Sequence, residues 1–325
     1  MKKIVLSLAA LAGILAACEK IEEGFISDLV RYKDNLILCK RGMPLVKSAP
    51  IEADGSTPPY TFTMSNLRGA DGKPAPPEFD TEYDLLVFKE GMAFNPETDT
   101  TLALLDAKRE IQQVKPMIFN EKSGQIVFNR GSVNLPLGDY VFDVDLQNVR
   151  GTKTFPSMGK ITVLDPYNED FFNFISSGAA SATPSEAFTD MKAPLVTCTR
   201  ISGEGARIIL KIVDKNGQPF NPKSGEIIKR GDRPTFESYA RFNPVEVTDT
   251  AMICDFEVAP FPMARYVTPA TDWGFLMYYR IPAEFVQVDN KSAKTESANP
   301  RFEFRIMMEG TYIVEVQMKD AERLQ

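Results

Sequence analysis

Short runs in which apolar and polar residues alternate dominate this chain, and turns rich in Gly, Pro and Asn separate them. Residues 140–147, 301–308 and 312–318 alternate with a period of two, and a further run lies at 208–212. Successive side chains of a strand point to opposite faces, so this period predicts strands with one buried face. The last two long runs meet at Glu309-Gly310, which predicts a β-hairpin there.

Two pairs of segments repeat weakly along the chain. Residues 138–144 parallel residues 310–316, since each begins with Gly and brings a Tyr into an alternating run. Residues 71–74 likewise parallel residues 214–219, where Asp, Gly and Pro mark a turn after an apolar run. We interpret these repeats as two tandem immunoglobulin-like β-sandwich domains in a mainly β chain. The alternative is a chance likeness between turn residues.

The predicted boundary between the two domains lies at residues 165 and 166, because Pro166 cannot continue the ladder of the preceding strand. One short helix is expected in the first domain, over residues 102–111, with Asp99 or Thr100 as its cap and Pro116 after its end. The sequence thus predicts a signal peptide at 1–17, a lipidated tether and N-terminal segment at 18–48, a first β-sandwich domain at 49–165 and a second at 166–325.

The first twenty residues predict export and lipid attachment. Lys2 and Lys3 precede an apolar stretch that is too short to span a bilayer but suits a signal peptide. The stretch ends Leu15-Ala16-Ala17-Cys18, which resembles a bacterial lipobox, so we expect lipidation at Cys18 and stable anchoring by two or three acyl chains. The alternative is an ordinary secretory signal with an incidental cysteine. The acidic residues 19–23 resemble the export tag of surface lipoproteins in Bacteroidota.

Composition excludes several kinds of chemistry. The chain has no histidine, which removes His-containing triads and imidazole metal ligands. Its 44 acidic residues exceed its 37 basic ones, and this balance argues against a nucleic-acid partner. No phosphate-binding loop or nucleophile-elbow motif is present. We expect no cofactor and no metal site, and we interpret Asp71 and Asp214 as turn residues rather than calcium ligands.

Three cysteines follow Cys18, at positions 39, 198 and 254. One disulfide among them is conceivable in an oxidising compartment, but its connectivity is not readable from spacing. Cys254 follows Ala251-Met252-Ile253, which favours a buried, apolar role.

Several motifs together resemble a known family. Tyr60-Thr61-Phe62, the turn at 71–76, residues 105–110, Ser123-Gly124-Gln125 and residues 138–144 are similar to the Bacteroidota lipoprotein family described as domain of unknown function 5007. The resemblance implies an accessory lipoprotein of the outer membrane, facing the cell exterior, that assists SusC/SusD-type uptake complexes. It carries no catalytic residue.

Aromatic residues supply the best indication of a ligand site, because their rings stack on sugar faces. The only tryptophan, Trp273, lies in a turn-rich stretch with Tyr266, and Arg265 and Asp272 there can hydrogen-bond hydroxyl groups. Tyr278 follows in an expected strand. The alternative is that Trp273 packs over the core or between the domains.

The sequence therefore predicts a non-catalytic surface lipoprotein that assists the capture of an oligosaccharide or another nutrient. One alternative is a structural or adhesive surface protein. Another is a glycoside hydrolase that works with two carboxylates, for which the acidic run at 78–84 and Glu97 and Asp99 are candidates.

Overall fold

The computed structural model describes residues 24–257 and 259–324. The chain is mainly β, which confirms the predicted fold class of β-sandwich domains. It divides into two compact units: unit 1 holds the described residues up to Tyr83 and residues 113–165, and unit 2 holds residues 84–112 and those from Pro166 onward. Cys18 and the predicted signal peptide lie outside the described residues.

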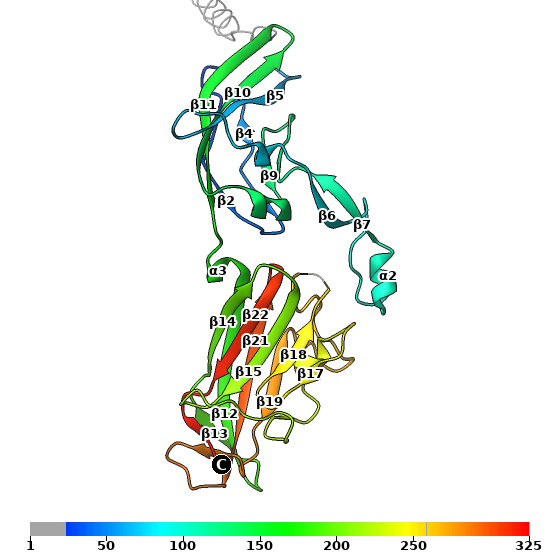
Figure 1. The fold of residues 1–325 in the computed structure, drawn as a ribbon, viewed down its shortest axis with the longest axis vertical. Coiled ribbons are helices and arrows are strands. Elements are labelled where there is room, and N and C mark those ends of the chain that lie inside the picture. The colour runs from blue at the N-terminus through cyan, green and yellow to red at the C-terminus, as the bar shows by residue number, and fades with distance from the viewer. Residues whose placement is uncertain (1–23, 258, 325) are drawn as a thin grey trace, which may run out of the picture. The chain divides into compact units, whose positions relative to one another are not determined.

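Unit 1 is built on one long sheet and several short ones. The main sheet contains, in spatial order, β2 (Leu36–Lys40), β11 (Gly151–Leu164), β10 (Gly138–Asn148) and β5 (Thr61–Gly69). The shorter pieces are β3 (Val46–Lys47), β9 (Ile126–Phe128) and β8 (Met117–Phe119) in one sheet, the pair β1 (Arg31–Tyr32) and β4 (Ile51–Glu52), and the 3-10 turns η1 (Pro77–Phe79) and η2 (Arg130–Asn134). Figure 1 shows β10 and β11 side by side as the longest pair.

The alternation predicted for residues 140–147 is confirmed on its apolar side, since Tyr140, Phe142, Val144 and Leu146 are all buried in the core of unit 1. Asp143 departs from the pattern only in its burial. The neighbouring strands β5 and β11 bulge beside it, and residues of these two strands cover its carboxylate. Burial alone raises the pKa of a carboxyl group. Hydrogen bonds from the Ser157 amide, Asn66 and Arg68 outweigh that effect and hold the pKa of Asp143 below its ordinary value.

Unit 2 contains two five-stranded sheets that form a β-sandwich (Figure 1). The first sheet contains β13 (Phe188–Met191), β12 (Phe172–Ala182), β21 (Glu296–Ile306), β19 (Leu276–Arg280) and β16 (Ile228–Lys229). The second contains β14 (Leu195–Ser202), β22 (Gly310–Gln317), β15 (Ala206–Val213), β18 (Met252–Asp255) and β17 (Glu246–Val247). The remaining elements are α3 (Asn168–Phe171), η3 (Phe236–Ser238) and the pair β20 (Val286–Val288) and β23 (Ala321–Arg323).

The predicted hairpin at Glu309-Gly310 is wrong, because β21 and β22 belong to different sheets. Both strands bury one apolar face: Phe302 and Phe304 on β21, and Tyr312 and Val314 on β22. Had the strands formed a hairpin, these faces would lie next to each other in one sheet. The chain instead crosses between the sheets after Ile306, so that both apolar faces are buried in the sandwich core.

The predicted helix at 102–111 is shorter than expected. α2 covers Leu102–Asp106, and its cap is Thr101, whose hydroxyl accepts a hydrogen bond from the Leu104 amide at 3.3 Å. Asp99 does not cap the helix: it is buried, accepts from the Asn95 amide and pairs with Lys108 at 2.7 Å. The second half of the predicted helix is strand β7 (Arg109–Val114), which pairs with β6 (Tyr83–Phe88).

The β6–α2–β7 segment belongs largely to unit 2, although the sequence placed residues 84–112 in the first domain. Arg109 is buried and donates to the carbonyl of Glu257 at 3.1 Å. Arg241 donates to the carbonyls of Asp99 and Pro96 and stacks over Phe94. These long-range contacts have no local sequence pattern, which is why the alternation of apolar residues did not reveal them.

The turn repeat predicted from 71–74 and 214–219 exists in the backbone. After β5, the Gly69 amide donates to the Lys73 carbonyl at 2.8 Å, and after β15 the Asp214 amide donates to the Gln218 carbonyl at 2.9 Å. Gly72 and Gly217 both adopt a positive φ, at 81° and 82°. The likeness is local, because β5 runs antiparallel to β10 whereas β15 runs parallel to β22.

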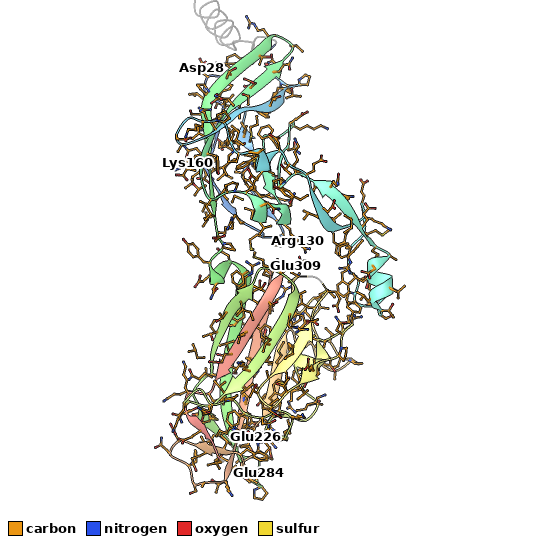
Figure 2. The ribbon with its side chains drawn as sticks, viewed as in Figure 1. Asp28, Arg130, Lys160, Glu226, Glu284 and Glu309 are labelled. Carbon is orange, nitrogen blue, oxygen red and sulfur yellow. The ribbon has the colours of Figure 1, made fainter. Side chains whose placement is uncertain are left out.

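Buried acidic groups around this turn in unit 2 have structural roles. Asp214 accepts hydrogen bonds from the amides of Asn216 and Gln218, as expected for a turn residue. Glu226, labelled in Figure 2, is buried and pairs with Arg323 at 2.6 Å. Among the described residues no group of His, Cys, Asp and Glu side chains could hold a metal ion.

Cys39, Cys198 and Cys254 are free thiols, and all three are buried. The buried position of Cys254 confirms its predicted role as a small apolar side chain. Burial raises the pKa of each thiol to about 12, so all three are protonated at neutral pH. In the part of the chain that the structure describes, no helix is both long enough and apolar enough to cross a membrane.

Candidate ligand-binding site

Residues 265–274 form a tight hairpin, here called the 265–274 hairpin. The Tyr266 amide donates to the Gly274 carbonyl at 2.8 Å, and the Trp273 amide donates back to the Tyr266 carbonyl at 3.0 Å. Thr268 and Thr271 exchange hydrogen bonds at the tip. This ladder brings Arg265 close to Asp272 and pairs Tyr266 with Trp273, so four of the five residues predicted for ligand contact lie together.

Arg265 and Asp272 bind each other at the surface. The guanidinium donates to both carboxylate oxygens, and the shortest contact is 2.7 Å. The hydrogen bond from Arg265, followed by one from the Gly274 amide, lowers the pKa of Asp272. Both side chains are exposed, so the pair presents a fixed donor and acceptor array to solvent.

Trp273 is half-buried, and the Arg233 guanidinium lies 5.9 Å from the centre of its ring. Tyr266 is also half-buried and meets Tyr239 edge to face at 6.2 Å. Tyr239 is fixed in turn, because its hydroxyl donates to the Leu276 carbonyl at 2.8 Å. The aromatic residues of the hairpin therefore stand at the border between the core of unit 2 and solvent.

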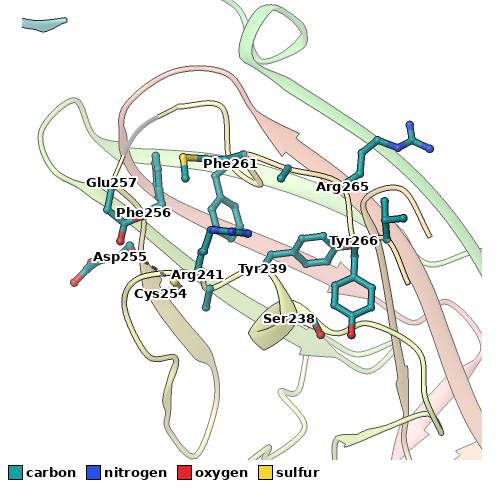
Figure 3. A pocket seen from close by; sticks show the side chains of 14 residues that line it. Ser238, Tyr239, Arg241, Cys254, Asp255, Phe256, Glu257, Phe261, Arg265 and Tyr266 are labelled. Atoms are coloured by element: carbon teal, nitrogen blue, oxygen red, sulfur yellow. Dashed lines mark hydrogen bonds between the residues drawn. The ribbon is translucent and has the colours of Figure 1, made fainter. Parts of the chain in front are cut away.

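A pocket of about 250 Å³ lies beside the hairpin (Figure 3). Of the predicted residues, Arg265 and Tyr266 line it, whereas Trp273, Asp272 and Tyr278 do not. Figure 3 shows the rings of Tyr239 and Tyr266 on one side of this pocket. The remaining lining comes from two segments of the chain, residues 238–241 and residues 254–267. The first segment contributes Ser238, Ala240 and Arg241, and the second contributes Cys254, Asp255, Phe256, Glu257, Phe261, Met263, Ala264 and Val267.

The pocket residues that the sequence reasoning missed include Tyr239, Arg241, Asp255 and Glu257. Tyr239-Ala240-Arg241 combines an aromatic and a basic residue outside any alternating run, which was the one available signal. Glu257 follows the apolar run at 251–254 and carried no signal at all.

The two acidic residues of the pocket have different electrostatic environments. Arg207 donates to both oxygens of Asp255, at 2.7 and 2.9 Å, and this pairing lowers the pKa of Asp255. Burial raises the pKa of Glu257, whose carboxylate accepts one hydrogen bond from Asn243 at 2.6 Å. Glu257 therefore holds a proton to higher pH than Asp255 does.

Tyr278 lies apart from this pocket, on strand β19. The Arg230 guanidinium lies 5.8 Å from its ring and 5.2 Å from the ring of Phe188. A larger, shallower hollow of about 630 Å³ lies in unit 1, between β5 and β8. Its walls combine apolar residues such as Met64 and Phe119 with the charged residues Asp80 and Lys115.

Residues 51–179 match the family model of a domain of unknown function (DUF5007). The matched segment reaches from β4 to β12 and does not include the pocket beside the 265–274 hairpin. No curated protein matches the chain.

Proposed function

We propose that this protein is a lipid-anchored, non-catalytic lipoprotein of the bacterial outer-membrane surface that captures an oligosaccharide or a similar nutrient. The observation that carries the proposal is the pocket of unit 2, in which two fixed tyrosine rings face charged donors and acceptors. Sugars need this combination, because their ring faces are apolar and their edges carry hydroxyl groups.

The size of the pocket favours a small ligand or one end of a longer one. Its volume of about 250 Å³ is below the usual range for drug-sized ligands, roughly 300–1,000 Å³. The exposed Arg265–Asp272 pair lies next to it, where a longer chain would leave the pocket. The walls are held by backbone and side-chain hydrogen bonds, which favours binding without rearrangement.

Membrane attachment in this proposal depends on Cys18 and on the lipobox-like residues before it. The acidic residues after Cys18 support display at the cell exterior, and the resemblance to Bacteroidota lipoproteins supports assistance to a SusC/SusD-type uptake complex. The match of residues 51–179 to a domain of unknown function agrees with this resemblance but names no ligand. An adhesive role would use the same anchor without a ligand pocket.

A second candidate function rests on Asp255 and Glu257. Both line the pocket, and their surroundings move their pKa values in opposite directions. Glycoside hydrolases use such a pair, with a protonated acid and an ionised partner. Arg207 occupies both oxygens of Asp255, however, so this carboxylate is not available as a nucleophile in the structure described.

The test is a glycan-array screen of the full-length protein purified in detergent, followed by titration of each binding glycan. We expect Tyr266→Ala to weaken binding by about tenfold or more, since an aromatic contact and a pocket wall are lost. Tyr167→Ala is the matched control, because Tyr167 is 67% exposed and lies outside the pocket.

Equal binding by the Tyr266→Ala and Tyr167→Ala variants would show that the pocket is not the site. Absence of binding to every glycan would overturn the proposed function. Cleavage of a bound glycan that Glu257→Gln abolishes would favour the hydrolase instead.

A further inference from the structure

The outer face of the first sheet of unit 2 carries an unusual row of charged residues on β21. Phe302, Phe304 and Ile306 point into the core, so Arg301, Glu303 and Arg305 point the other way. Residues two apart on a strand are roughly 7 Å apart, so the two arginines lie on the same face with Glu303 between them.

Arg305 is a half-buried cation that has no counter-charge among the described residues. Its Nε atom is buried and has no hydrogen-bond acceptor among the described residues, and its guanidinium stacks on Phe275 at 4.5 Å. Burial lowers the pKa of Arg305, as expected for a charge that is partly removed from water. A partly buried charge of this kind costs free energy unless an anion pairs with it.

Arg301 likewise has no charged partner among the residues that the structure describes. In the described part of the chain it forms no ion pair or side-chain hydrogen bond, and Glu303 is not within ion-pair distance of either arginine. Most arginines of unit 2 differ in this respect. Arg207, Arg280 and Arg323 each bind a carboxylate, in a chain where acidic residues outnumber basic ones.

The strands beside β21 place uncharged residues opposite each arginine. On β12, Asn173 lies opposite Arg305 and Ser177 lies opposite Arg301, and on β19 Tyr278 lies opposite Arg301 from the other side. Arg301 and Ser177 also line a hollow of about 230 Å³ on this face. Cations, hydroxyl or amide donors and an aromatic ring are therefore arranged along one surface.

We propose that this surface binds the anionic groups of an acidic oligosaccharide, with Arg305 and Arg301 as the residues that hold them. The proposal rests on the proposed function, because it names the class of oligosaccharide that the protein captures. Carboxylate and sulfate groups are the two sources of the charge. Both accept hydrogen bonds from guanidinium groups, and Phe275, Tyr278 and Ser177 supply contacts for the uncharged part of the sugar.

The experiment compares matched ligands by isothermal titration calorimetry on the full-length protein in detergent. The ligands are trigalacturonate, its neutral methyl ester and a sulfated galactose oligosaccharide, which separates carboxylate from sulfate. We expect at least one acidic ligand to bind the wild type, with an affinity that falls as NaCl rises. Arg305→Gln and Arg301→Gln should each weaken acidic binding by about tenfold or more and leave binding of the methyl ester unchanged.

Arg31→Gln in unit 1 is the control variant, because Arg31 is exposed and pairs with Glu52 at the surface. A second measurement separates a binding role from a structural one. Since Arg305 has no counter-charge in the part of the chain that the structure describes, Arg305→Gln should leave the melting temperature unchanged or raise it, whereas removal of a structural arginine would lower it.

Three outcomes would overturn the inference. Equal binding of the acid and its methyl ester, with no effect of Arg305→Gln, would remove the anion site while oligosaccharide capture stands. Binding of a polyglutamate peptide with the same arginine dependence, but of no acidic oligosaccharide, would make the partner an acidic protein. Absence of binding to any oligosaccharide would overturn the proposed function as well.

Discussion

Tyr140 and Tyr312 make the same hydrogen bond in the two units of the chain. Each hydroxyl donates to the carbonyl four residues earlier, Tyr140 to Pro136 at 3.1 Å and Tyr312 to Met308 at 2.8 Å. Each tyrosine is buried and stands two residues after a glycine with positive φ, where a long strand begins. The arrangement resembles the tyrosine corner of β-sandwich proteins, which ties the chain entering a strand to the strand itself.

Tyr312→Phe is therefore expected to destabilise unit 2 by about 1–2 kcal/mol, because the carbonyl of Met308 loses its partner in a buried position. Tyr140→Phe should have a similar effect on unit 1. Denaturant unfolding of each variant measures the change. Tyr60→Phe is the control, since the Tyr60 hydroxyl has no hydrogen bond among the described residues, and a loss there as large as at Tyr312 would contradict the explanation.

The sequence predicted the strands well because their signal is local. Alternating residues at 140–147, 301–306 and 312–317 do form strands with one buried face. The same pattern could not show which sheet a strand joins. The period of two is identical for a hairpin and for two strands that cross between sheets, and this is why the predicted hairpin at Glu309-Gly310 was wrong.

The candidate site was partly predictable for a similar reason. Arg265, Tyr266, Asp272 and Trp273 are close in sequence, so one hairpin brings them together. The opposite wall of the pocket is formed by residues 238–241 and 254–257, which only the tertiary fold places there. The environment of Arg305 was equally invisible, because only the tertiary fold shows that the described strands beside it place no carboxylate within ion-pair distance.

Cys18→Ala should release the protein from the membrane fraction. Cys18 lies outside the described residues, but lipid attachment there is the anchor expected from the sequence, and no helix of the described part could span a bilayer. Fractionation of cells followed by immunoblotting measures the distribution. Cys39→Ala is the control because this buried thiol has no role in anchoring. Retention of the Cys18→Ala variant in the membrane pellet would show that another attachment dominates.

Glu257→Gln should stabilise unit 2 at neutral pH but not in acid. Burial raises the folded-state pKa of Glu257 above its ordinary value of 4.5. The protonated side chain therefore contributes its full stabilisation of the folded state below pH 4.5. The contribution is lost as the pH rises through the folded pKa and the buried carboxyl group ionises. Thermal melts from pH 4 to pH 8 should therefore show the variant and the wild type converging at the acidic end.

The glutamine retains the contact with Asn243, because its side-chain oxygen still accepts the hydrogen bond that Glu257 accepts at 2.6 Å. Asp255→Asn should behave in the opposite way, since Asp255 has a lowered pKa and pairs with Arg207. Loss of the charge of Asp255 should destabilise the folded protein at neutral pH and have a smaller effect in acid. A constant stability difference across the whole pH range for Glu257→Gln would contradict the proposed burial of its charge.

Trp273→Ala tests the role of the 265–274 hairpin most directly. Trp273 is half-buried beside Arg233, so its removal should cost roughly 1–2 kcal/mol of unfolding free energy, less than the about 3–5 kcal/mol expected for Phe304→Ala in the core. Thermal melts of the Trp273→Ala and Phe304→Ala variants decide whether Trp273 lies at the border of the core or within it. If the ring also contacts the ligand, the folded variant should lose glycan binding while retaining most of its stability. A loss of stability as large as that of Phe304→Ala would show that Trp273 is a structural residue and not a ligand contact.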